Sequence, residues 1–161
     1  MQILSAYLLA TVSGGGYAGN MLPENLLNLS NWEKNGAITI DYADGVNNVT
    51  VATDGRGEYI QLIATGLEAG KMYEFSWDGC CQTMPFPGYI PGYDYVDVFI
   101  TQQYASMAQT KWDLTSDTVK NYTLDFISNT DTATIRFDFG KVKDSTITKW
   151  VIENLALYEV N

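Results

Sequence analysis

Aromatic and planar polar side chains are the residues of this chain best suited to contact another molecule. A proline-rich stretch, residues 81–95 (CQTMPFPGYIPGYDY), carries Phe86, Tyr89, Tyr93 and Tyr95 in what we expect to be an ordered loop. Aromatic rings offer flat apolar faces to the C–H groups of a pyranose, and nearby polar side chains bind its hydroxyls. The stretch is therefore a candidate sugar site. In the alternative interpretation, its rings only seal an edge of the domain or contact a neighbouring subunit.

A second candidate surface follows from polar residues that alternate with apolar ones. If neighbouring strands bring these polar side chains together, they form a groove with an aromatic ring, an amide and a guanidinium group. The alternative is an ordinary solvated face on which the arginine pairs with a carboxylate. The residues concerned are Tyr59, Gln61, Asp97, Thr101, Arg136 and Asp138.

Composition excludes several other kinds of chemistry. The chain has no histidine, which removes the usual general base and the imidazole metal ligand. Nothing singles out a catalytic pair among its 19 acidic residues, so we expect no enzymatic activity. With only 9 basic residues the formal charge is −10, which disfavours nucleic acid and anionic membranes as partners.

The two cysteines, Cys80 and Cys81, are adjacent in the chain. They cannot link distant segments, and two thiols without histidine cannot complete a tetrahedral zinc site. Two states remain open: a vicinal disulfide, or two reduced thiols of which one points inward and the other outward.

Short β-prone runs separated by turn residues dominate the chain from Asn25 onward. This pattern predicts an all-β antiparallel sandwich of about eight or nine strands. The clearest alternation places Ala133, Ile135 and Phe137 on a buried face. Residues 149–160 are apolar on both sides, which predicts a central strand, whereas residues 104–112 (YASMAQTKW) suggest a helical turn or a loop.

The N-terminus differs from this body. Residues 1–22 form a predicted hydrophobic arm with a glycine-rich joint, and residues 23–161 form the sandwich. The arm has no basic residue before its apolar run and about half the length that a bilayer span needs, so we interpret it as structure. An apolar arm needs a partner surface, either its own sandwich or another chain, and we favour another chain. Its candidate assembly residues are Ile3, Leu4, Tyr7, Leu8, Leu9 and Val12.

Three stretches of the body together resemble carbohydrate-binding modules of the jelly-roll type, the group that includes families four, nine and twenty-two. They are residues 25–27 with Trp32, then GEYIQL (57–62) with LEAGKMYEFS (67–76), and finally IRFDFG (135–140) with WVIENLALY (150–158). The resemblance implies a jelly-roll sandwich and a non-catalytic glycan-binding role. Many such modules hold a calcium ion between acidic residues of the first and last strands. Here Glu153 replaces the usual aspartate and no acidic residue directly follows Asn28, so we expect no metal or cofactor, with a structural calcium as the open alternative.

The whole design also resembles small bacteriophage virion proteins that decorate heads, tails or fibres. This resemblance implies a protein made in the cytoplasm without a signal peptide and displayed on a virion or another extracellular assembly. We therefore expect a glycan-binding or adhesive module, anchored by its arm as a homo-oligomer or on a larger complex. The alternative is a purely structural decoration subunit that binds no sugar.

Overall fold

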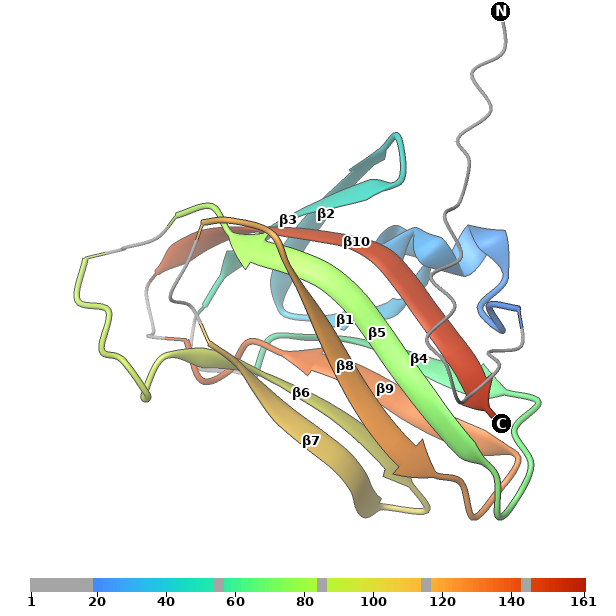
Figure 1. The fold of residues 1–161 in the computed structure, drawn as a ribbon. Coiled ribbons are helices and arrows are strands. Elements are labelled where there is room, and N and C mark those ends of the chain that lie inside the picture. The colour runs from blue at the N-terminus through green and yellow to red at the C-terminus, as the bar shows by residue number, and fades with distance from the viewer. Residues whose placement is uncertain (1–18, 54–56, 84–86, 114–116, 143–145) are drawn as a thin grey trace, which may run out of the picture.

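Two antiparallel five-stranded sheets, packed face to face, form the body of the protein (Figure 1). The computed structural model describes residues 19–53, 57–83, 87–113, 117–142 and 146–161. The first sheet has the order β1-β4-β9-β6-β7, and the second has the order β2-β3-β10-β5-β8. The all-β jelly-roll sandwich predicted from the sequence is confirmed, with ten strands in the described ranges.

The strands follow one another along the chain after two short 3-10 helices. The helices are η1 (Glu24–Leu27) and η2 (Leu29–Asn31). The strands are β1 (Glu33–Asn35), β2 (Ala37–Ala43), β3 (Val46–Ala52), β4 (Tyr59–Thr65), β5 (Met72–Cys81), β6 (Tyr95–Gln102), β7 (Ala105–Asp113), β8 (Lys120–Ile127), β9 (Thr132–Asp138) and β10 (Ile147–Val160). No helix in these ranges has the length and apolarity needed to cross a membrane.

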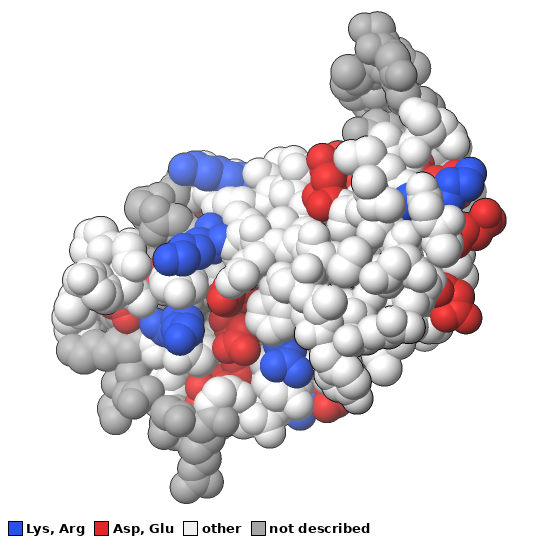
Figure 2. Space-filling view, turned by 90° about the horizontal axis from the view of Figure 1, so that it is seen from below, with Lys and Arg blue, Asp and Glu red and all other residues white. Residues whose placement is uncertain are grey.

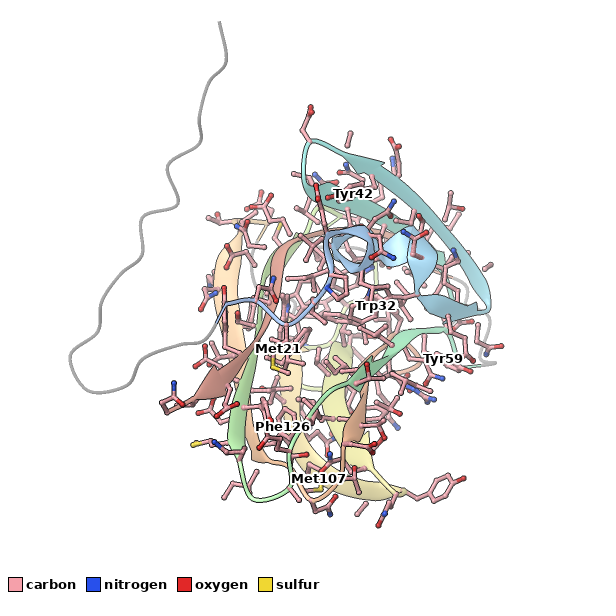
Figure 3. The ribbon with its side chains drawn as sticks, turned by 90° about the vertical axis from the view of Figure 1, so that its right-hand side faces the viewer. Met21, Trp32, Tyr42, Tyr59, Met107 and Phe126 are labelled. Atoms are coloured by element: carbon pink, nitrogen blue, oxygen red, sulfur yellow. The ribbon has the colours of Figure 1, made fainter. Side chains whose placement is uncertain are left out.

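The core lies between the sheets and is rich in aromatic rings. Every second residue of β5, β6 and β9 points into it, which confirms the buried face predicted for residues 133–137. Trp77 packs edge-on against Trp112 and Phe137 with ring centroids 6.2 and 5.4 Å apart. In Figure 3, Trp32 and Phe126 point into this layer, whereas Tyr59 lies on the outside of β4. Burial of these rings supplies the main driving force for the sandwich.

The helical turn or loop suggested for residues 104–112 is wrong, because this segment forms strand β7. Its register with β6 shifts between Ile100 and Thr101: Thr101 faces Ser106, whereas Ile100 faces Ala108. Met107 is thus an extra residue, and such a bulge interrupts the two-residue period from which a strand is predicted. The central position predicted for the last strand is confirmed, since β10 lies between β3 and β5.

Both cysteines are buried and reduced in the structure, on the same strand. Successive residues of a strand point to opposite faces, and the neighbours Trp77 and Gly79 place Cys81 on the core side and Cys80 on the outer side of β5. Burial raises the pKa of both thiols, and the adjacent Cys81 raises that of Cys80 further. Of the two states considered for the pair, the structure shows the reduced one.

Gly79 makes room for the ring of Trp112. A Cβ atom at this position would lie 2.6 and 2.7 Å from two ring carbons of Trp112, and 2.8 Å from the carbonyl oxygen of Val151. Trp112 is only 1% exposed and cannot move away freely. We therefore expect Gly79→Ala to lower the free energy of unfolding by about 1–3 kcal/mol, measured by urea denaturation.

A double-mutant cycle tests this cause. The smaller ring of Trp112→Phe should accept the added methyl group, so Gly79→Ala should cost less in that background than in the wild type. An equal cost in both backgrounds would show that the ring contact is not the reason.

The segment before β1 is tied to the last strand by one buried amide. Asn47 on β3 is fully buried, and its Oδ1 accepts a hydrogen bond from the backbone N–H of Leu29 at 2.8 Å. Its Nδ2 donates to the carbonyl oxygens of Leu27 at 2.9 Å and Ile152 at 3.1 Å. One side chain thus joins three parts of the chain: strand β3, the segment before β1 and strand β10.

Candidate functional site

The outer face of the first sheet carries two rows of polar and aromatic side chains that cross all five strands. Strand register places Glu33, Gln61, Arg136, Phe99 and Gln109 side by side in one row. The second row, two residues further along each strand, is Asn35, Tyr59, Asp138, Asp97 and Lys111. We call these ten residues the polar–aromatic face.

Alternation within each strand explains why these side chains point outward. On β4, Ile60 is fully buried, which turns Tyr59 and Gln61 to the opposite side. On β9, Ile135 and Phe137 are likewise buried on either side of Arg136. Figure 2 views the molecule from the side of this sheet, and basic and acidic side chains lie next to one another there.

Arg136 is the centre of the face. Its guanidinium carbon lies 3.9 Å from the ring centroid of Tyr59 and 5.5 Å from that of Phe99, so the cation is packed against aromatic rings from two flanking strands. Its Nε and Nη2 both donate to Oε1 of Gln61, at 2.9 and 2.6 Å. Its nearest carboxylate contact is longer, with Nη1 3.9 Å from Oδ2 of Asp138. The guanidinium plane is therefore fixed by rings and an amide more than by an ion pair.

Glu33 holds Tyr59 and Gln61, two of the side chains that contact Arg136, in place. Its carboxylate accepts a hydrogen bond from the Tyr59 hydroxyl at 3.2 Å and one from Nε2 of Gln61 at 2.8 Å. Because the amide nitrogen of Gln61 is held by Glu33, the amide oxygen is directed to Arg136. A continuous chain of hydrogen bonds thus orders this side of the face before any ligand arrives.

The other side of the face is ordered in the same way. Nε2 of Gln109 lies 2.8 Å from each carboxylate oxygen of Asp97. Nζ of Lys111 lies 4.4 Å from the ring centroid of Tyr95, which precedes Asp97 on β6. Asp97 and Asp138 are direct cross-strand partners, so acceptors for hydrogen bonds concentrate between the two ordered sides.

The structure brings together some of the residues predicted from the sequence and separates others. Tyr59, Gln61 and Arg136 are neighbours on the face, with Asp97 and Asp138, and Tyr95 lies at its edge. Tyr89 packs against the core and Tyr93 is 78% exposed on the loop between β5 and β6, apart from the two rows. Phe86 and the arm residues Ile3, Leu4, Tyr7, Leu8, Leu9 and Val12 lie outside the described residues.

Sequence reasoning missed several members of the face. Glu33 lies on a strand of three residues, which is too short to show a period. Phe99 did give a signal, because it is an aromatic residue at an outward position between the buried Val98 and Ile100. Gln109 and Lys111 lie on β7, where the bulge hides the alternation.

The structure places Asn28 and Glu153, the two positions considered for a structural calcium, next to other partners. Oδ1 of Asn28 accepts a hydrogen bond from the backbone of Ser30, and Glu153 faces Asp78 and Val46 across the sheet. Within the described ranges, no group of three or more His, Cys, Asp or Glu side chains is placed to hold a metal ion. The amide of Asn47 makes the link between the first segment and the last strand.

Comparison with known proteins supports the fold. No family model matches the sequence, and no curated protein matches it. A CBM4 structure superposes with a TM-score of 0.58 and 18% identity, over 86% of this chain and 93% of the other. The CBM22-1 xylan-binding domain of Paenibacillus barcinonensis Xyn10C superposes with a TM-score of 0.53 and 11% identity, over 81% of this chain and 86% of that domain. The enzymatically active domain of tailspike protein 4 of bacteriophage CBA120 superposes with a TM-score of 0.56 and 16% identity. The match covers 87% of this chain but only 21% of the tailspike chain. The chain therefore has the fold of carbohydrate-binding modules.

Proposed function

We propose that the protein binds glycans on the polar–aromatic face and does not catalyse a reaction. The observation that carries this proposal is the guanidinium group of Arg136, which packs against the rings of Tyr59 and Phe99 in rows that cross the whole sheet. Planar groups flanked by ordered amides and carboxylates suit the apolar faces and the hydroxyls of sugar rings. Preordering reduces the entropy lost when the ligand binds.

Charge favours an uncharged glycan. The described side chains of the face include three carboxylates, Glu33, Asp97 and Asp138, against the cations Arg136 and Lys111. The whole chain carries −10, so a polyanionic polysaccharide would be repelled over a long range. A neutral chain would pay no such electrostatic cost.

The fold supports this proposal. Carbohydrate-binding modules predominate among the similar structures, although the tailspike domain and a Stig cyclase from Fischerella sp. share the fold. A glycan array followed by calorimetric titration with cellohexaose and xylohexaose tests the proposal. Saturable binding to a neutral glycan is expected, and a chain that binds no glycan on the array would contradict it.

We further propose that residues 1–18 anchor this module in a larger assembly, such as a phage virion. The occurrence of the same fold within a phage tailspike supports this idea. The described chain begins next to β10: the backbone N–H of Met21 donates to the carbonyl oxygen of Leu157 at 2.8 Å, and Leu22 is buried. A decoration subunit without a sugar ligand remains the second candidate function, favoured by the apolar run in the arm.

Deletion of residues 1–18 tests the anchor. The deletion ends before Asn20 because the side chain of Asn20 accepts hydrogen bonds from the backbones of Leu22 and Leu157, so the sandwich should stay intact. We expect the full chain to self-associate and the shortened chain to be a monomer with an unchanged melting temperature, measured by light scattering and calorimetry. The same mass for both proteins would contradict the anchoring role.

A further inference from the structure

The hairpin that joins β6 and β7 displays a tyrosine in an unfavourable backbone conformation. Gln102 faces Ala105, so the turn consists of Gln103 and Tyr104 alone. Both residues have positive φ angles, 48° and 67°. Two-residue hairpin turns of this kind favour Asn and Gly, because other residues are strained there. Backbone preference therefore does not explain the presence of this tyrosine.

Packing does not explain it either. Tyr104 is fully exposed, at 105% of the reference value, and makes no hydrogen bond or ring contact within the described part of the chain. An exposed aromatic ring on a strained turn gives no stability to the folded monomer. Strain of this kind is typical of positions that contact a ligand.

The base of the hairpin is held rigidly. Gln102 is 2% exposed, and its Nε2 donates to Oγ of Ser128 at 2.7 Å and to the carbonyl oxygen of Thr132 at 2.7 Å. Its Oε1 accepts from the backbone N–H of Asn129 at 2.9 Å. Figure 3 shows Met107 near this end of the sheet, and Asn129 lies 4.0 Å from its sulfur. The tip is thus presented from a fixed position.

The surface between the tip and the polar–aromatic face is open. The next row of the same sheet consists of Ile63, Thr134, Thr101 and Ser106. Three of these side chains are short, and Ile63 is 60% exposed. A chain bound on the face can pass over Thr134, Thr101 and Ser106 to the hairpin without meeting a large side chain.

We infer that Tyr104 is a separate aromatic contact for a pyranose ring of a long or branched glycan bound on the polar–aromatic face. This inference rests on the proposed function and extends the site along β6 to the end of the sheet. The ring stacks on the C–H groups of the sugar, and its hydroxyl reaches sugar hydroxyls. A short oligosaccharide held on the two rows does not reach it.

Two glycine variants test this inference as a matched pair. Gln103→Gly and Tyr104→Gly both relieve the strain of a positive φ angle, and each should raise the melting temperature by about 2–4 °C. Only Tyr104→Gly removes the ring. We expect it to weaken binding to soluble xylan and hydroxyethylcellulose about fivefold to tenfold in affinity electrophoresis, whereas Gln103→Gly should bind as the wild type does.

Trisaccharides separate this contact from the main face. Affinities for xylotriose and cellotriose should be equal in Tyr104→Gly and the wild type. If Tyr104→Gly binds the polymers as tightly as the wild type, while Arg136→Ala loses them, the inference is overturned and the proposed function stands; this result also follows if Tyr104 contacts a protein. A wild-type chain that binds no glycan on the array overturns both.

Discussion

Replacement of Arg136 by alanine should weaken glycan binding by about a hundredfold. The change removes the planar cation that packs between Tyr59 and Phe99, and it leaves Oε1 of Gln61 without its two donors. The neighbouring rings then lose their fixed spacing, and the amide turns toward water. Calorimetric titration with the neutral oligosaccharide that the wild type binds measures the loss.

The fold should survive this substitution. The Arg136 side chain is 28% exposed and its contact with Asp138 is long, so the loss of its ring contacts and hydrogen bonds should lower the free energy of unfolding by only about 1–2 kcal/mol. Lys149→Ala is the matched control, because it removes one positive charge from an exposed site on β10 in the opposite sheet. If both variants bind as the wild type does, the polar–aromatic face is not the site. Arg136→Lys should remain weak, because an ammonium group keeps the charge and loses the plane.

The sequence predicted which segments form strands better than it predicted which strands lie side by side in a sheet. Clean alternation identified β9, and the two-sided apolar pattern identified β10 as central. The bulge at Met107 hid β7, and β1 is too short for a period to appear. Strand identity depends on local side-chain order, which a sequence displays directly.

The site depends on sheet order, which is not local. Gln61 and Arg136 are 75 residues apart in the chain and share a hydrogen bond, because β4 and β9 are neighbours in the sheet. The outward direction of both residues was predictable, whereas the partnership with Glu33 and Phe99 required the strand order. The aromatic loop was the more conspicuous candidate, but of its three rings among the described residues only Tyr95 is placed beside the two rows, in contact with Lys111. To find the residues of the candidate site, a high density of aromatic residues along the chain is thus a weaker guide than an outward position on adjacent strands.

Removal of the buried amide of Asn47 should have the largest effect on stability. In Asn47→Ala the backbone N–H of Leu29 and the carbonyl oxygens of Leu27 and Ile152 lose their partner at a site that is fully buried. Each buried group left without a hydrogen bond costs about 1–3 kcal/mol, so we expect the free energy of unfolding to fall by about 3–5 kcal/mol. Urea denaturation followed by tryptophan fluorescence measures this change.

The neighbouring residue provides the control for Asn47. Asn48 is exposed on the other face of β3, and Asn48→Ala should change stability by about 0.5 kcal/mol or less. Similar small effects for both variants would contradict the anchoring role of Asn47. The Asn47 link also bears on binding, because β1 begins one residue after Trp32 at the end of this segment. If the segment loosens, Glu33 no longer holds Tyr59 and Gln61 in place, so Asn47→Ala should weaken glycan binding even under conditions in which it stays folded.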